Sequence, residues 1–138
     1  MESLVIVGAS LAGLSAARAA RSLGFAGRVV IIGDELQRPY DRPPLSKDFL
    51  AGRAELADLT LETDTEALGA EWILGTRAAS FDPSTRTVHL EDGGMVHAEA
   101  LVIATGASPR NLPQIAGADN VVTLRTIADA QKLRELVR

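Results

Sequence analysis

An α/β fold with a parallel central sheet is predicted by three features of the sequence. Residues 5–13 read Val-Ile-Val-Gly-Ala-Ser-Leu-Ala-Gly, an apolar strand that runs into a glycine turn and a helix of small residues. Residues 28–33, Arg-Val-Val-Ile-Ile-Gly, repeat the buried-strand pattern after that helix, as in a βαβ unit. Apolar and polar residues alternate over 77–81 and 87–90, with turn residues after each stretch, which predicts an antiparallel β-meander.

The first strand and its turn have the sequence form of a dinucleotide-binding βα unit. Gly8 would make the tight turn, and Gly13 would let the helix pack close to the strand, with the helix N-terminus directed at a pyrophosphate. Ser10 stands where this fingerprint normally has its second glycine, so either the ligand lies slightly farther away or the serine hydroxyl donates to it. An ordinary strand-ending turn is the alternative. The residues expected to contact the nucleotide are Gly8, Ser10, Leu11, Ala12 and Gly13.

The helix predicted over residues 11–23 has one face of small residues and one polar face. The small face carries Gly13, Ala16, Ala17 and Ala20, and the polar face carries Ser15, Arg18 and Ser22. This spacing is expected of a helix that packs tightly on a sheet.

Two acidic residues, Asp34 and Glu35, follow the second strand, roughly 20 residues after the glycine turn. A carboxylate at this point can accept hydrogen bonds from both hydroxyls of an adenosine ribose. An acid here also argues against a 2′-phosphate on the nucleotide. A solvated acidic loop is the alternative interpretation.

Composition and charge exclude several classes of protein. A net charge of −4 and a pI near 5.1 give no basic surface for nucleic acid. The chain has no cysteine, which excludes disulfide scaffolds, thiolate metal sites and iron–sulfur ligation by these residues. His89 and His97 are too few to build a metal site, so we expect them to be ordinary surface or strand residues.

The sequence also gives no sign of a membrane protein. Residues 4–17 carry no charge, but this segment is too short and too rich in glycine to span a bilayer. Glu2 precedes it where a signal peptide would have Lys or Arg. We therefore expect a cytoplasmic chain that binds neither membrane nor nucleic acid.

Two longer motifs resemble a known family. Residues 36–50 read Leu-Gln-Arg-Pro-Tyr-Asp-Arg-Pro-Pro-Leu-Ser-Lys-Asp-Phe-Leu, and residues 101–110 read Leu-Val-Ile-Ala-Thr-Gly-Ala-Ser-Pro-Arg. With residues 5–13 and 33–35, they resemble the FAD-binding part of the NAD(P)H:ferredoxin and rubredoxin reductases that serve bacterial oxygenases, a group related to apoptosis-inducing factor. The resemblance covers essentially the whole chain and implies a Rossmann-like FAD-binding domain. Related disulfide reductases carry redox cysteines after the second strand, and this chain has none.

The resemblance assigns Lys47, Arg42 and Pro43 to the flavin nucleotide. Lys47 would lie beside N5 and the pyrimidine side of the isoalloxazine and act as the catalytic cation, because positive charge there stabilises reduced flavin. Arg42 and Pro43 would lie near the pyrophosphate and ribityl chain. The alternative is a rigid surface loop with ordinary cations.

Further contacts are implied by the same resemblance. Ala78 would offer backbone groups to the adenine, and the turn of Ala104, Thr105 and Gly106 would lie against the flavin, where glycine allows close approach. Arg125 would reach the phosphates or the flavin edge. An ordinary strand-ending turn and a helix-capping cation are the respective alternatives for residues 104–106 and for Arg125.

Local patterns predict the remaining elements. Pro39, Pro43 and Pro44 are expected to hold an extended loop, and Ser46 to cap a short helix through Phe49 and Leu50. Further strands are expected over residues 71–78, 101–104 and 121–122, a short helix over 66–68 with its cap near Thr63, and a final helix through 137 that Thr126 or Asp129 begins.

These features predict that residues 1–138 form the N-terminal segment of a FAD-dependent oxidoreductase whose NAD(P)H-binding domain is absent from this incomplete fold. In the complete enzyme a nicotinamide would deliver hydride to FAD, which would pass electrons to a ferredoxin or rubredoxin. One alternative is a non-catalytic nucleotide-binding fragment. Another is an NAD-dependent dehydrogenase domain, which would need a catalytic Tyr/Lys or His/acid pair, and the sequence offers only Tyr40 inside the proline loop.

Overall fold

The computed structural model describes residues 1–61, 65–110, 112–115, 117–118 and 120–137. They fall into two compact units. Unit 1 comprises Met1–Pro39 and Leu61–Gly106, and unit 2 comprises Tyr40–Thr60 and Ala107–Arg138.

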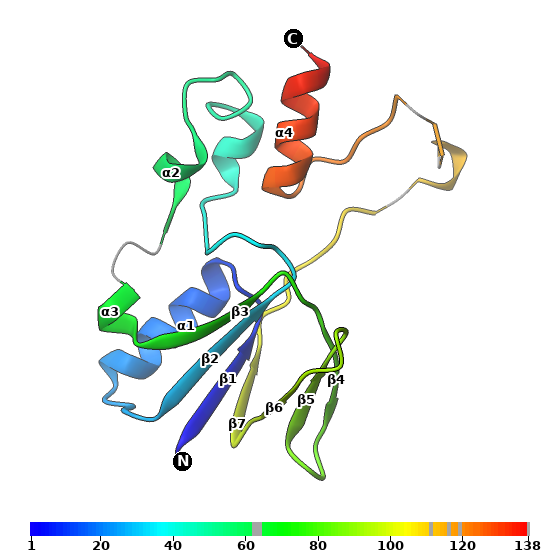
Figure 1. The fold of residues 1–138 in the computed structure, drawn as a ribbon. Coiled ribbons are helices and arrows are strands. Elements are labelled where there is room, and N and C mark those ends of the chain that lie inside the picture. Colours follow the sequence, from blue (N-terminus) through cyan, green and yellow to red (C-terminus); the bar gives the residue numbers. More distant parts are fainter. Residues whose placement is uncertain (62–64, 111, 116, 119, 138) are drawn as a thin grey trace. The chain divides into compact units, whose positions relative to one another are not determined.

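Unit 1 is built on a parallel sheet with the strand order β3-β2-β1-β7 (Figure 1). Its strands are β1 (Ser3–Val7), β2 (Arg28–Gly33), β3 (Ala70–Leu74) and β7 (Ala100–Ile103). All three neighbouring pairs are parallel, with β1 between β2 and β7. The predicted parallel sheet and its first βαβ unit are therefore confirmed.

Helix α1 (Leu11–Ser22) covers one face of this sheet. Its Gly13, Leu14 and Ala17 are buried, whereas Ser15, Arg18 and Ser22 are exposed, as the sequence pattern predicts. The buried side chains pack on alternate residues of the strands, namely Leu4, Ile6, Val29 and Ile31. Burial of this apolar surface holds the helix to the sheet.

Arg21 secures the end of α1 that lies farther from the glycine turn. Its guanidinium donates to the backbone carbonyls of Phe25 and Gly27 at 2.7 Å and to that of Leu68 at 2.8 Å. Leu68 is the last residue of helix α3 (Thr65–Leu68), so Arg21 links three segments of backbone. Thr63, the expected cap of this helix, lies outside the described residues.

The opposite face of the sheet is covered by an antiparallel β-meander, as predicted (Figure 1). Its strands are β4 (Ala78–Asp82), β5 (Thr87–Leu90) and β6 (Met95–His97). The meander buries Val88, Leu90 and Val96 against Val5, Val30 and Ile32. Because side chains alternate along a strand, β1 and β2 supply one set of apolar residues to α1 and the other to the meander.

The strand predicted over residues 71–78 is wrong beyond Leu74, where β3 ends. Gly75 has a φ of +75°, and a Cβ on it would lie 2.5 Å from Cδ2 of Leu36. The chain therefore turns at Gly75 and enters the meander at Ala78. Likewise β7 ends at Ile103, one residue before the predicted end, and residues 121–122 form no strand because they pair with neither sheet.

In unit 2 a small apolar core takes side chains from two of its three short helical segments and from its longer helix. The segments with helical geometry are η1 (Pro43–Ser46), α2 (Leu56–Leu59), η2 (Pro113–Ile115) and α4 (Ile127–Leu136). The buried core comprises Tyr40, Leu45, Phe49, Leu59, Ile127 and Ala130. Thr126 begins α4, as predicted, and shares a capping box with Asp129.

The extended conformation expected of the prolines is wrong at Pro43 and Pro44, which form the start of η1. The fixed φ of proline suits the first positions of a helix, where its missing N–H has no intrahelical partner to lose. Ser46 is the last residue of η1, so the expected helix through Phe49 and Leu50 is also wrong, and turns occupy residues 47–52 instead.

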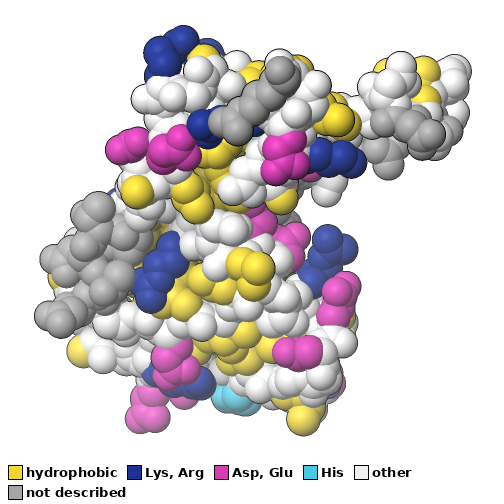
Figure 2. All heavy atoms as spheres, turned by 45° about the horizontal axis from the view of Figure 1, so that its top comes forward, with side chains coloured by type: hydrophobic (Ala, Val, Ile, Leu, Met, Phe, Trp, Pro, Cys, Tyr) yellow, Lys and Arg dark blue, Asp and Glu magenta, His cyan; other side chains and the backbone are white. Residues whose placement is uncertain are grey.

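The face drawn in Figure 2 shows Lys and Arg side chains interspersed with Asp and Glu side chains. In the described part of the chain, no helix has the length and apolar character needed to cross a membrane.

The turn between β4 and β5 yields a prediction about acid stability. Oδ1 of Asp82 accepts hydrogen bonds from the hydroxyl of Ser84 at 2.6 Å and from its N–H at 2.8 Å. These bonds, the hydroxyl first, lower the pKa of Asp82 from 3.8 to about 2. A carboxylate with a lowered folded-state pKa stabilises the fold above its unfolded pKa, and this contribution disappears as the pH falls toward about 2.

We therefore expect Asp82→Asn to make the decline of melting temperature between pH 4 and pH 2 shallower, since amide replaces the titrating group. Circular dichroism melts across this range measure it. Ser84→Ala, which removes the hydroxyl donor alone, should flatten the same decline partly. An unchanged slope in both variants would contradict the assignment.

Candidate functional site

The turn after β1 lies directly against the turn after β7. Gly8 has a φ of +123°, and its N–H donates to the carbonyl of Ile32 at 2.8 Å. A Cβ on Gly8 would lie 2.1 Å from the carbonyl oxygen of Ala104 and 3.1 Å from the nitrogen of Thr105. The structure thus brings together Gly8, Ala104 and Thr105, three of the residues that the sequence predicts for one site.

Gly13 and Gly33 permit two further close approaches. A Cβ on Gly13 would lie 1.9 Å from the carbonyl oxygen of Gly8, so the first turn of α1 touches the glycine turn through backbone alone. A Cβ on Gly33 would lie 2.4 Å from the Cβ of Ala9, so the end of β2 also packs against this turn. Glycine at these three positions allows the strand-turn-helix unit to close.

The N-terminus of α1 opens from this turn. Ser10 is the N-cap residue, with extended backbone angles, and its side chain makes no capping hydrogen bond to the helix. Leu11 and Ala12 are exposed, and the first turn of α1 contains no acidic residue. The first N–H groups of a helix lack intrahelical partners and carry partial positive charge, which makes such a terminus suitable for an anion.

A surface pocket of about 530 Å³ lies beside the end of β2. It is lined by Asp34, Gly75, Thr76, Arg77, Glu91 and Asp92. Nη2 of Arg77 lies 3.5 Å from Oδ2 of Asp34, and both side chains are exposed. Glu35 does not line the pocket, but its carbonyl accepts a hydrogen bond from the N–H of Gly75 at 3.0 Å.

The residue predicted to contact an adenine does not line this pocket. Ala78, the predicted contact, is half-buried at the start of β4 and packs on the meander core, outside the pocket lining. The three residues before it, 75–77, line the pocket instead. Sequence reasoning missed them because it extended β3 through them, although the glycine at position 75 marked the turn.

Unit 2 holds a second pocket, of about 220 Å³. Its lining comprises Arg42, Pro43, Leu45, Ser46, Leu124 and Arg125. Nη1 of Arg42 donates to the carbonyl of Arg125 at 2.9 Å, so the two arginines are joined although they are 83 residues apart. Three predicted site residues, Arg42, Pro43 and Arg125, therefore lie together in this pocket. Ser46, which the sequence predicts only as a helix cap, also lines the pocket and carries a hydroxyl group.

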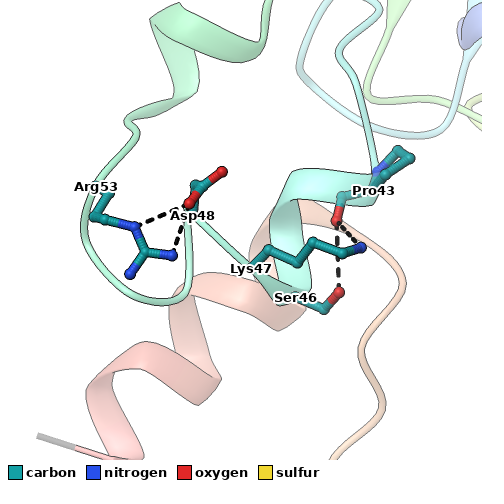
Figure 3. Close-up of polar contacts among 5 residues, drawn as sticks. All are labelled: Pro43, Ser46, Lys47, Asp48 and Arg53. Atoms are coloured by element: carbon teal, nitrogen blue, oxygen red, sulfur yellow. Dashed lines mark hydrogen bonds and ion pairs between the residues drawn. The ribbon is translucent and has the colours of Figure 1, made fainter.

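Lys47 follows η1 and is exposed. Its Nζ donates to the carbonyl of Pro43 at 3.2 Å, and the Ser46 hydroxyl lies 3.5 Å from the same oxygen (Figure 3). The neighbouring Asp48 is paired with Arg53 at 2.7 Å. Lys47 does not line the pocket of unit 2.

The histidines lie in the meander, His89 half-buried on β5 and His97 exposed on β6. Within the ranges that the structure describes, no group of three or more His, Cys, Asp or Glu side chains could hold a metal ion.

Comparison with known proteins gives a consistent result. The family described as pyridine nucleotide-disulphide oxidoreductase matches residues 2–137. The ferredoxin–NAD(+) reductase subunit of the benzene 1,2-dioxygenase system of Pseudomonas putida is 41% identical, and the alignment covers 96% of this chain and 33% of that protein. The chain therefore spans about a third of the length of this relative.

Two solved structures share the fold. In the covalent complex of putidaredoxin reductase with putidaredoxin, the reductase matches with a TM-score of 0.91 and 36% identity, over 99% of this chain and 34% of the other. NADH:rubredoxin oxidoreductase from Clostridium acetobutylicum matches with a TM-score of 0.82 and 31% identity, over 97% of this chain and 35% of the other.

The close approach at Gly13 leads to a test of the strand-turn-helix unit. In an open helix Gly→Ala would stabilise the fold by about 1 kcal/mol, whereas overpacking costs about 1 to 3 kcal/mol. Since a Cβ at Gly13 would meet backbone at 1.9 Å, we expect Gly13→Ala to lower the free energy of unfolding. Chemical denaturation measures it, with Ser15→Ala on the exposed face of α1 as control. Stabilisation by both substitutions would contradict the geometry.

Proposed function

Because the chain belongs to the pyridine nucleotide-disulphide oxidoreductase family, we propose that its residues form the FAD-binding segment of a ferredoxin reductase. The observation that carries this proposal is the backbone contact of the turns at Gly8 and Ala104 beneath the N-terminus of α1. Such an arrangement suits a dinucleotide pyrophosphate, since it offers backbone N–H groups without obstruction by side chains.

The residues of unit 1 are compatible with the adenosine half and the pyrophosphate of FAD. The N–H groups at the start of α1, from Leu11 and Ala12 onward, would hold the pyrophosphate, with the Ser10 hydroxyl as a further donor. Asp34 would accept hydrogen bonds from the ribose hydroxyls. The 530 Å³ pocket beside it has the size of a small-molecule site, and its residues 75–77 offer backbone groups to the adenine edge.

Asp34 is a better candidate for the ribose than Glu35. Asp34 lines the pocket and reaches Arg77, so its carboxylate is directed to the surface where a nucleotide would bind. Ala78 follows directly after the pocket-lining residues 75–77, and we propose that only its backbone groups contact the adenine. Thr105 and Gly106 are exposed at the end of β7, where they would face the flavin portion.

The residues of unit 2 would supply positive charge. Arg42 and Arg125 line one pocket together with Pro43, the exposed first residue of η1, and guanidinium groups suit phosphate oxygens. Lys47 would place its ammonium near the flavin ring, where positive charge favours the reduced form. FAD, when bound, would supply the ability to accept a hydride and release single electrons.

The catalytic cycle would require the sequence that makes up the other two-thirds of the relatives. We propose that NAD(P)H binding and contact with an iron–sulfur protein depend on that sequence. Two relatives point to the class of acceptor by their names, because one reduces a ferredoxin of a dioxygenase system and the other reduces rubredoxin. A ferredoxin or rubredoxin is accordingly the proposed electron acceptor.

The assignment of Asp34 is tested by comparing Asp34→Ala with Glu35→Ala. Loss of hydrogen bonds to a charged acceptor costs about 1.5 to 3 kcal/mol, which is roughly 10- to 150-fold in affinity. We expect a rise of this size in the dissociation constant of FAD for Asp34→Ala and a smaller one for Glu35→Ala, measured by flavin fluorescence titration. Equal losses would show that the ribose lies beside Glu35 as well.

The function is tested in a chimera that carries residues 2–137 in place of the matching third of the Pseudomonas putida reductase. We expect the chimera to purify with FAD and to oxidise NADH with ferricyanide, and the 138-residue chain alone to show no turnover. A chimera that folds without flavin would refute the FAD site. Turnover by the short chain would refute its assignment as one segment of the enzyme.

A further inference from the structure

The single tyrosine of the chain lies at the centre of unit 2, in a position that links its core to its pocket. Tyr40 is 4% exposed, and its ring packs in the apolar core with Phe49 and Ile127. Its hydroxyl oxygen accepts two hydrogen bonds, one from the N–H of Ile127 at 2.9 Å and one from Nη1 of Arg42 at 3.2 Å. A hydroxyl has two acceptor lone pairs, and these donors use both.

The first of these bonds completes the N-terminus of α4. The carboxylate of Asp129 accepts from the N–H groups of Arg125 and Thr126, and the Thr126 hydroxyl accepts from the N–H of Asp129. The N–H of Ile127 is buried and turns to Tyr40 instead. Tyr40 thereby fixes where α4 begins, and with it the backbone of Arg125.

The second bond acts on Arg42, whose described contacts restrain it from more than one side. Its guanidinium carbon lies 5.1 Å from the centre of the Tyr40 ring, a cation–π contact. Nη1 donates to the Tyr40 hydroxyl at 3.2 Å and to the carbonyl of Arg125 at 2.9 Å. Both hydrogen bonds use Nη1, so the guanidinium is held through this one nitrogen. Arg42 lines the same pocket as Arg125 and Ser46.

We propose that Tyr40 is a positioning residue, whose hydroxyl holds Arg42 ready for a phosphate of the flavin nucleotide. This inference rests on the proposed function for its ligand, but its geometry belongs to unit 2 alone. A long arginine side chain loses rotamer freedom when it binds an anion, and an arginine that is already held loses less. The Tyr40 hydroxyl thus contributes to affinity without touching the ligand.

The first measurement needs no flavin. In the 15N-labelled chain, the Nη–H signals of Arg42 are identified by their loss in Arg42→Lys, and their exchange with water is measured by NMR, because Nη1 is the atom that donates to the Tyr40 hydroxyl. Tyr40→Phe keeps the ring and removes the hydroxyl, so we expect exchange to become about three- to tenfold faster, as the loss of one hydrogen bond implies. Unchanged exchange would overturn the proposal.

The second measurement is the dissociation constant of FAD. We expect Tyr40→Phe to raise it about three- to tenfold in the parent chain and to leave it unchanged in an Arg42→Ala background, since only a held Arg42 transmits the effect. An equal rise in both backgrounds would mean that the hydroxyl acts on stability alone. If the parent chain binds no FAD, the proposed function fails, and the exchange measurement still decides the role of Tyr40.

Arg134→Ala is the matched control for general loss of stability. Arg134 pairs with Glu55 at 2.9 Å and lies over the Phe49 ring at 5.3 Å, so its loss weakens the same core without touching Tyr40 or Arg42. We expect it to lower the melting temperature and leave Arg42 exchange and FAD affinity unchanged. A rise in both would contradict a specific role for the hydroxyl.

If Tyr40→Phe does not fold, biosynthetic replacement of tyrosine by 3-fluorotyrosine substitutes position 40 alone. It weakens the oxygen as an acceptor and retains the hydroxyl. We expect a smaller increase in Arg42 exchange in the same direction, and no increase would overturn the proposal.

Discussion

Backbone contact at the glycine turn is the constraint on which unit 1 depends. Gly13 meets the carbonyl of Gly8, Gly8 meets the carbonyl of Ala104, and none of these approaches leaves room for a Cβ. Contact of this kind sets the height of α1 above the sheet, because any side chain at Gly13 would lift the first turn of the helix. It also keeps the N–H groups at the helix start open toward the edge of the sheet where the turns meet.

Because the strands are parallel, the turns that carry the candidate site residues of unit 1 lie at the same edge of the sheet. The carboxyl ends of parallel strands lie together, and β1, β2, β3 and β7 are followed by the turns at Gly8, Asp34, Gly75 and Ala104. Two layers that share no side chains, α1 and the meander, bury the strands from opposite faces. The turns are thus carried by a rigid base, which is what a site made largely of backbone groups needs.

Unit 2 uses a different device, because it has little regular structure. One buried hydroxyl joins the proline segment around Arg42 to the start of α4, and the capping box at Thr126 and Asp129 completes the same helix end. Few hydrogen bonds therefore determine the position of both arginines. The Arg42 guanidinium is held by a hydroxyl, a backbone carbonyl and an aromatic ring, whereas the ion pair of Arg77 and Asp34 in unit 1 lies exposed and contributes little stability.

Local sequence alone was sufficient for the elements whose patterns are strong. The apolar run and small residues of positions 5–22 predicted β1, the glycine turn and the buried face of α1, and Thr126 with Asp129 predicted the start of α4. The strand predicted over residues 71–78 is too long, because a pattern of apolar residues does not indicate where a chain turns out of a sheet. The turn at Gly75 becomes visible only through its close contact with Leu36 in the folded structure. Pro43 and Pro44 were misread because their fixed φ fits both extended and helical backbone. Only tertiary structure placed Arg125 beside Arg42, since that contact spans 83 residues and depends on where the Tyr40 hydroxyl caps α4.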